Sequence, residues 1–324
     1  MSKKIMGVTV GTPIRPSKFA SELADRVEEM VKANTEQEKT VDITENGTVE
    51  IVPDEGYKLT KVTANVNVSG ENKLAQLVDG TITEITAQDL EGITEIRSNA
   101  FYRANNLISV AIPNGVTTLN GYSFANCSNL ENVTFPNTLT HIDEYVFNND
   151  KKLINITFPN TLETIYNYAF NGCESLTDII IPDSVISTGG DIFRNCINLK
   201  TAVIGNGLPD IKGYMFYNCT SLDTVVIGNN VSDIGNSAFY NCQSLVNLTI
   251  PAKVEFIGTH LTIGTTTNKA TITLLGTTPP NIYATTFSNT NLINKIIVPA
   301  GYGDVYKSAT NWANVAEFIE EASV

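Results

Sequence analysis

One phenylalanine recurs every 23 residues through the middle of the chain, and this period constrains the fold more than any other feature. Chance does not place seven of the thirteen phenylalanines in a chain of 324 residues at one constant interval. The seven members are Phe101, Phe124, Phe147, Phe170, Phe193, Phe216 and Phe239. A fixed period of roughly 20–50 residues is typical of arrays in which one small structural unit is stacked many times.

Other positions keep the same interval. After Phe124, for example, come Leu130, Val133, Phe135 and Pro136, at six, nine, eleven and twelve residues. The residues at nine and eleven alternate with polar ones, which predicts a short strand buried on one face. Proline ends such a strand because it has no N–H group to donate. We expect the later aliphatic positions, spaced by three, to follow a turn or 3₁₀ path, and the segment ending in each Phe to form a short helix.

A single repeat cannot enclose its own apolar residues, but stacked copies bury a continuous core. The sequence therefore predicts a β-rich solenoid over residues 78–262, in which short parallel strands of successive 23-residue repeats lie side by side.

The pattern L-x-x-V-x-F-P-x-x-L-x-x-I-x-x-x-x-F-x-x-C, read over the coils from Leu130 to Cys173, is similar to the BspA-type leucine-rich repeat. The resemblance extends over about residues 80 to 300 and implies a leucine-rich-repeat solenoid. Residues 263–324 are similar to the degenerate repeat and C-terminal cap that such arrays often carry, which implies that Trp312, Val315, Phe318 and Ile319 close that end of the core. Families of this kind are mostly surface adhesins and binding proteins, so the resemblance also implies a function other than catalysis.

Each of the five cysteines occupies the third position after a repeat Phe, and Asp150 takes that position in one coil. They are Cys127, Cys173, Cys196, Cys219 and Cys242. Neighbouring coils about 4.8 Å apart could bridge such residues, so the spacing allows disulfides, although buried thiols are favoured. No C-x-x-C motif occurs, and His141 and His260 lie elsewhere in the repeat, so we expect no metal ion and no cofactor.

A row of asparagines lies just before the cysteine position. Its members are Asn126, Asn149, Asn195, Asn218 and Asn241. We expect a structural role for them, because stacked amides can satisfy backbone groups in buried turns.

Two segments precede the repeats. Residues 1–39 are expected to form an attachment segment with a helix at about residues 17–34. Its apolar stripe is a candidate oligomerisation surface that comprises Phe19, Leu23, Val27, Met30 and Val31. Residues 40–70 alternate apolar and polar positions around an Asn46-Gly47 turn, which predicts a small antiparallel β-module.

The pieces T-x-N-G-T and V-P-D-E-G-Y in this module resemble structural proteins of tailed bacteriophages. By analogy with phage fibres, the resemblance favours a homo-oligomer, most simply a trimer. Lys3 and Lys4 begin the chain as in a signal peptide, but the apolar run from Ile5 to Val10 is too short for one. We therefore expect no secretory export.

The charge narrows the choice of partner. A net charge of −13 argues against nucleic acid and anionic membranes, and the charge-free stretches contain Asn, Thr and Pro, which argues against membrane insertion. With two histidines and no recognised catalytic motif, we expect no enzyme and no catalytic residue.

We expect instead a phage virion structural protein, in a fibre, tail tip or capsid decoration. Its repeats would bind a host cell-surface protein or glycan, or another virion protein. The alternative is a bacterial cell-surface or secreted BspA-like adhesin.

Two outward rows are candidate partner-contact surfaces. The first is apolar where Thr is the usual residue and comprises Ile180, Val203 and Val226. The second comprises Tyr122, Tyr145, Tyr168 and Tyr214, because tyrosine suits glycan or protein recognition. Alternatively, a neighbouring segment or subunit covers the first row, and the second simply packs along the rim of the solenoid.

Overall fold

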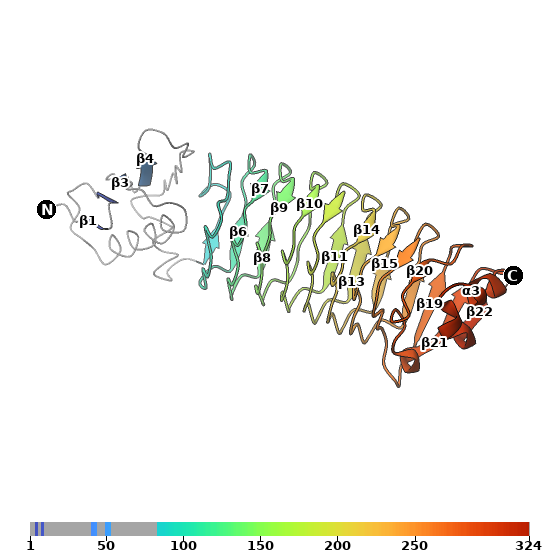
Figure 1. Ribbon diagram of the computed structural model, residues 1–324. Helices are drawn as coiled ribbons and strands as arrows, with labels where there is room; N and C mark the ends of the chain where they lie inside the picture. Colours follow the sequence, from blue (N-terminus) through green and yellow to red (C-terminus); the bar gives the residue numbers. More distant parts are fainter. Residues whose placement is uncertain (1–3, 6–7, 10–39, 44–48, 53–82, 324) are drawn as a thin grey trace.

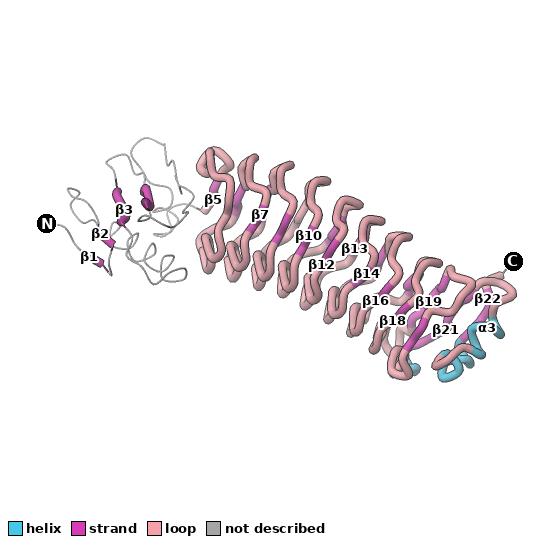
Figure 2. The backbone as a smooth tube through the Cα atoms, turned by 45° about the horizontal axis from the view of Figure 1, so that its top comes forward, coloured by secondary structure: helices cyan, strands magenta, loops and turns pink. Residues whose placement is uncertain are grey.

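The computed structural model describes residues 4–5, 8–9, 40–43, 49–52 and 83–323. Residues 83–323 form a solenoid whose coils lie side by side along one long axis, with the helices of the C-terminal cap at one end (Figures 1 and 2). Two ladders of short parallel strands run along it. The expected solenoid of stacked 23-residue repeats with short parallel strands is confirmed.

The first ladder contains the strands predicted from the alternating apolar positions. Corresponding residues of adjacent coils pair directly, as in Asp178↔Thr201↔Thr224. The strands are β5 (Glu84–Ile85), β6 (Ser109–Ala111), β8 (Asn132–Thr134), β11 (Asp178–Ile181), β13 (Thr201–Ile204), β15 (Thr224–Val226), β17 (Asn247–Ile250), β19 (Ala270–Leu274), β21 (Ile293–Val298) and β22 (Ile319–Glu321). We call its outward side the strand face.

The second ladder was not expected, since the sequence predicted a turn or 3₁₀ path there. It consists of two-residue parallel strands: β7 (Thr118–Leu119), β9 (His141–Ile142), β10 (Thr164–Ile165), β12 (Ser187–Thr188), β14 (Asp210–Ile211), β16 (Asp233–Ile234), β18 (Phe256–Ile257) and β20 (Asn281–Ile282). A two-residue strand is too short to show an alternating apolar and polar pattern in the sequence of one repeat. The strands exist because adjacent coils hydrogen-bond to each other here.

The third side of each coil carries the Phe segment, and the expected short helix is wrong. Around Phe124, the backbone is left-handed at Tyr122 (φ 59°) and at Asn126 (φ 62°), which interrupts any helix. The N–H groups of these three residues donate to carbonyls of the next coil at 2.8–3.1 Å, while those between them bond within their own turn. We call this side, from two residues before each Phe to two after it, the turn face.

The core is a continuous stack along the solenoid axis. The repeat Phe side chains from Phe124 to Phe239 are fully buried, and neighbouring rings lie 5.0–5.6 Å apart with nearly parallel planes. Such offset pairs stabilise a fold by about 0.5–1.5 kcal/mol each beyond the area they bury. Each coil therefore depends on its neighbours for most of its stabilisation.

The C-terminal cap closes one end of this core. It contains η1 (Thr290–Leu292), α3 (Gly303–Ser308) and η2 (Trp312–Phe318). Trp312, Val315 and Ile319 are buried, and Phe318 packs against the core while partly exposed. The indole N–H of Trp312 donates to the Pro280 carbonyl at 2.8 Å, which satisfies its polar group inside the core.

Four short strands are described before residue 83. β1 (Lys4–Ile5) pairs antiparallel with β2 (Val8–Thr9), and β3 (Thr40–Ile43) pairs antiparallel with β4 (Val49–Val52). The expected helix at residues 17–34, with Phe19, Leu23, Val27, Met30 and Val31, lies outside the described residues. So does most of the expected 40–70 module. The oligomerisation stripe, the trimer and the proposed domain boundaries remain predictions.

All five cysteines are buried thiols. Each Sγ donates to the carbonyl of the Phe in the preceding coil at 3.0–3.3 Å, as Cys196 does to Phe170. The sulfur atoms are thus directed at backbone oxygen rather than at one another. Burial raises the pKa of the Cys196 thiol to about 12, so at neutral pH the reactive thiolate is scarce.

Asp150 occupies the cysteine position of its coil and is also fully buried. One carboxyl oxygen accepts the Cys127 N–H at 2.7 Å, and the other, within the described part of the chain, has no hydrogen-bond partner. Burial raises the pKa of Asp150 well above its ordinary value of 3.8. The fold therefore favours the neutral, protonated form of the Asp150 carboxyl group.

We predict that Asp150→Cys stabilises the protein at neutral pH by about 1–3 kcal/mol, because the buried carboxyl with an unmet oxygen is removed. A raised folded-state pKa means that the unfolded chain releases its proton first, so wild-type stability falls as pH rises from about 4 toward the folded-state pKa. Urea unfolding at pH 4 and pH 8 measures both effects. Asp178→Asn on the strand face is the control, and equal pH dependence in wild type and D150C would contradict the prediction.

We further predict that the native protein does not react with a thiol reagent such as dithionitrobenzoate within minutes, because every thiol is buried and hydrogen-bonded. In denaturant, all five thiols should react at once. The released chromophore counts them. Rapid stoichiometric labelling of the native protein would show that the cysteine positions are open to solvent.

Candidate recognition surface

The apolar row on the strand face lies where the repeat register predicted it. Ile180, Val203 and Val226 pair in register across β11, β13 and β15. Ile180 is 64% exposed and Val226 51%, and Val203 is partly exposed. We call these three residues the apolar stripe. It is one residue wide, since the neighbouring outward positions of the same strands are Asp or Thr.

Three of the four predicted tyrosines form a regular stack on the turn face. The rings of Tyr122 and Tyr145 lie 4.7 Å apart, and those of Tyr145 and Tyr168 lie 4.8 Å apart, with interplanar angles of 8° and 7°. All three have the same left-handed backbone, so the side chains leave successive coils in the same direction. We call these three residues the tyrosine ladder.

Tyr214 does not belong to this stack, because the intervening coil carries Asp191 in place of Tyr. Asp191 has the same left-handed backbone (φ 58°) and is only 8% exposed. It accepts a hydrogen bond from Arg194 at 2.9 Å, and the two form an ion pair. The repeat analysis did not single out this pair, although Asp191 could have been recognised as the acidic residue that breaks the Tyr row.

In the two coils after Asp191, aromatic side chains also occupy the position one residue after the repeat Phe. The guanidinium of Arg194 lies 4.5 Å from the ring centre of Tyr217 and 5.9 Å from that of Tyr214. Tyr217 in turn stacks on Tyr240 at 4.9 Å. We call Tyr214, Tyr217 and Tyr240 the second aromatic group. The Asp191–Arg194 pair thus connects it to the tyrosine ladder.

The pair is coupled electrostatically to the ladder. Partial desolvation, and then the charge of Asp191 and its hydrogen bond with the phenol, raise the pKa of Tyr168. The hydrogen bond to Asp191 raises the pKa of Arg194, which keeps the guanidinium charged. At neutral pH the Tyr168 phenol is therefore uncharged and lies beside a paired carboxylate and guanidinium.

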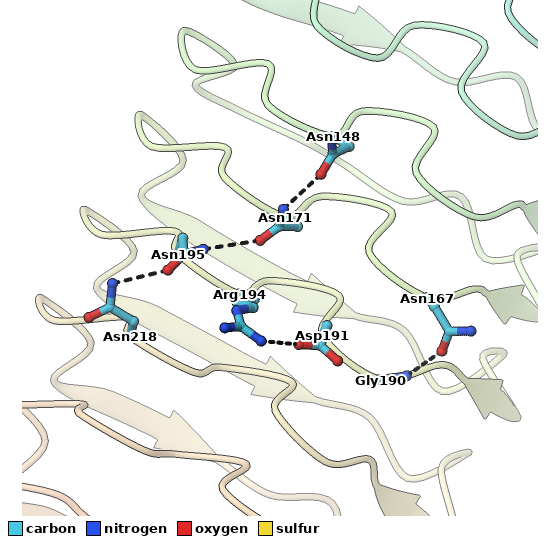
Figure 3. A network of polar contacts seen from close by, with 8 residues as sticks. All are labelled: Asn148, Asn167, Asn171, Gly190, Asp191, Arg194, Asn195 and Asn218. Atoms are coloured by element: carbon cyan, nitrogen blue, oxygen red, sulfur yellow. Dashed lines mark hydrogen bonds and ion pairs between the residues drawn. The ribbon is translucent and has the colours of Figure 1, made fainter.

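Beside the pair runs a ladder of asparagine amides, shown in Figure 3. Asn218 donates to Asn195 at 3.0 Å, Asn195 to Asn171 at 3.3 Å, and Asn171 to Asn148 at 2.7 Å (Figure 3). The sequence predicted that these amides satisfy buried backbone groups, but this is not their main role. The amides bond to each other and are partly exposed.

The ladder of asparagine amides shifts by one residue where Gly172 replaces the usual Asn. Gly172 has a left-handed backbone (φ 73°), and a Cβ there would meet the Asn149 side-chain oxygen at 2.6 Å. Asn171 supplies the amide instead. A further amide, that of Asn167, accepts the Gly190 N–H at 2.8 Å and so fixes the turn that carries Asp191 (Figure 3).

The described residues include no group of three or more His, Cys, Asp or Glu side chains placed to hold a metal ion. In the same part of the chain, none of the helices has the length and apolarity needed to cross a bilayer. What the turn face does present is a dense set of hydroxyl, amide and aromatic groups, which is suited to non-covalent binding.

A family model described as the BspA type leucine rich repeat region, with six copies, matches residues 94–222, 140–268 and 193–315. The family matches cover more than half of the chain. None of the proteins with curated functions matches the chain.

Among solved structures, a T. pallidum leucine-rich repeat protein is 27% identical, with coverage of 50% of this chain and 78% of that one and a TM-score of 0.47. A leucine-rich cell surface protein from Faecalibacterium prausnitzii is 22% identical, with coverages of 73% and 69% and a TM-score of 0.42. A leucine-rich repeat protein from Bacteroides ovatus is 22% identical, with coverages of 89% and 99% and a TM-score of 0.42.

We predict that exchanging the apolar stripe for the usual Thr, in Ile180→Thr, Val203→Thr and Val226→Thr together, changes the unfolding free energy by less than about 0.5 kcal/mol per site, because the side chains are exposed. Ile179→Thr, at a buried position of the same strand, should cost several times more. Urea unfolding and light scattering test this. A large loss of stability, or a lower mass in solution, would show that a neighbouring subunit covers the stripe.

Proposed function

The chain belongs to the BspA-type leucine-rich repeat family, and we propose that it is a non-enzymatic recognition protein of the bacterial cell surface. The observation that carries this proposal is the turn face, where rings, hydroxyls and amides of successive coils are held outward in register. None of these side chains is needed to fill the core. Their arrangement supports binding, and the family resemblance favours an adhesin-like role.

The geometry suits a large partner. Stacked coils create an extended, regular surface rather than an enclosed site, and such surfaces are what repeat proteins use for macromolecular recognition. The inward positions are occupied by Phe, Leu, Ile, Val and Cys, whose task is packing. Substituting outward residues can therefore change what is bound without changing the fold.

The virion role expected from the sequence is the second reading. It depends on the phage-like pieces in residues 40–70, of which only β3 and β4 are described, and no comparison supports it. The family match begins at residue 94 and favours the alternative, a cell-surface or secreted BspA-like adhesin. A virion role, with a partner among virion proteins or on a host cell, is tested by labelling intact cells and purified virus particles.

We predict that antibodies against the solenoid label intact cells of the source organism, and that brief protease treatment of those cells removes the label. Virus particles induced and purified from the same culture serve as the matched sample, and a cytoplasmic enzyme serves as the control for cell integrity. Recovery of the protein in purified particles, with none on the cells, would establish the virion reading. Detection only inside the cells would exclude both.

A further inference from the structure

The turn face is continuous along much of the solenoid. The tyrosine ladder, the Asp191–Arg194 pair and the second aromatic group occupy successive coils without a gap. At ~4.8 Å per coil, the five steps from Tyr122 to Tyr240 span roughly 24 Å. A ligand that uses this surface must be extended along the solenoid axis.

The exposed chemistry of the tyrosine ladder is polar rather than apolar. The rings stack at 4.7–4.8 Å, so they cover one another's faces, and what remains open is ring edges and hydroxyl groups. Each phenol can donate one hydrogen bond and accept others. A protein hot spot, by contrast, normally buries aromatic faces in a fitted pocket. A polyhydroxylated chain is the better complement to a row of hydroxyls.

The charge of this surface points to a neutral ligand. Arg194 is paired with Asp191, and the protein as a whole carries a net charge of −13. A polyanion would be repelled by the protein and would find no unpaired cation in this row of residues. Uncharged sugars meet neither difficulty.

The row of tyrosine rings is interrupted after Tyr168. Tyr168 and Tyr214 occupy equivalent positions two coils apart, about 9.6 Å by the coil spacing, and the coil between them contributes Asp191 instead of a ring. Gly189 and Gly190, which precede Asp191, add no side chains. Asp191, only 8% exposed, and the Arg194 guanidinium, 5.9 Å from the ring centre of Tyr214, fill this coil, so it presents polar groups rather than a ring.

The ion pair supplies polar groups at the same place. Arg194 has five N–H donors, and its contact with Asp191 is made through Nη1. The Asp191 carboxylate accepts a hydrogen bond from Arg194, and its charge acts on the Tyr168 phenol. Donors and acceptors held by charge-assisted bonds in this way are fixed in direction, which suits recognition of sugar hydroxyls.

We propose that the turn face binds an extended neutral polysaccharide, with the sugar chain running along the tyrosine ladder and across the Asp191–Arg194 pair. The proposal rests on the recognition role proposed above and names its ligand class. Its test uses purified protein only, so its failure leaves the cell-surface assignment to be judged by its own experiment.

Affinity electrophoresis of the full chain tests the proposal. The neutral probes are mannan, glycogen, arabinoxylan and hydroxyethylcellulose; the anionic probes are polygalacturonate and hyaluronan; and gelatin is the polypeptide probe. We expect retardation by at least one neutral polysaccharide and by neither anionic one. We also expect affinity for oligosaccharides of the bound type to rise with length up to the span of the face.

Two variants locate the site. Asp191→Tyr should remove the carboxylate that holds Arg194, on a backbone that already suits Tyr at its neighbours, and weaken binding by about tenfold or more. Tyr168→Ala removes one ring and should do the same. Tyr302→Ala, an exposed tyrosine in the cap, and the apolar-stripe Thr variant should bind as wild type does. Circular dichroism confirms that each variant is folded.

Each remaining result overturns the proposal in a defined way. Binding to gelatin alone would assign the face to a polypeptide partner, and binding to the anionic probes alone would exclude the neutral class. Polysaccharide binding that both Asp191→Tyr and Tyr168→Ala leave unchanged would place the site elsewhere. Retardation by none of the probes would remove the turn face as a glycan surface.

Discussion

Hydrogen bonding between coils is the constraint on which the rest of this structure depends. On all three sides of a coil, backbone N–H groups donate to carbonyls of a neighbouring coil, including the turn face, where alternate residues around each Phe from Phe101 to Phe216 do so. A coil alone would leave these groups unpaired and its Phe half-solvated. Only the stack is stable, and the spacing of the backbone then sets the spacing of every side-chain row.

Because that spacing is constant, identical residues meet identical residues, and the chemistry of each row follows. Phe rings stack, amides of Asn bond head to tail, and cysteine thiols reach the same carbonyl in each coil. A residue that breaks its row becomes conspicuous for the same reason. Asp150 does so inside the core, where it lacks a second partner, and Asp191 does so at the surface, where Arg194 pairs with it.

Much of the fold could be predicted from the sequence, because a period needs no knowledge of the third dimension. The positions of Ile179 and Ile181 in the core and of Ile180 outside it followed from their place in the repeat. The two-residue strands and the left-handed turn at Tyr122 did not, since both depend on bonds to a neighbouring coil. The helix predicted at the Phe segment was wrong for that reason.

The sequence by itself determined the solenoid, the residues that face inward, and the rows of Tyr, Asn and Cys, because each is a matter of register. Tertiary structure alone decided how the members of a row meet. Stacking angles, the thiol-to-carbonyl bonds and the position of Arg194 over Tyr217 arise from distances across coils that are far apart in the chain. For that reason the recognition surface we propose includes Asp191. In the sequence this residue is only an exception to the Tyr row, and its pairing with Arg194 is visible only in the structure.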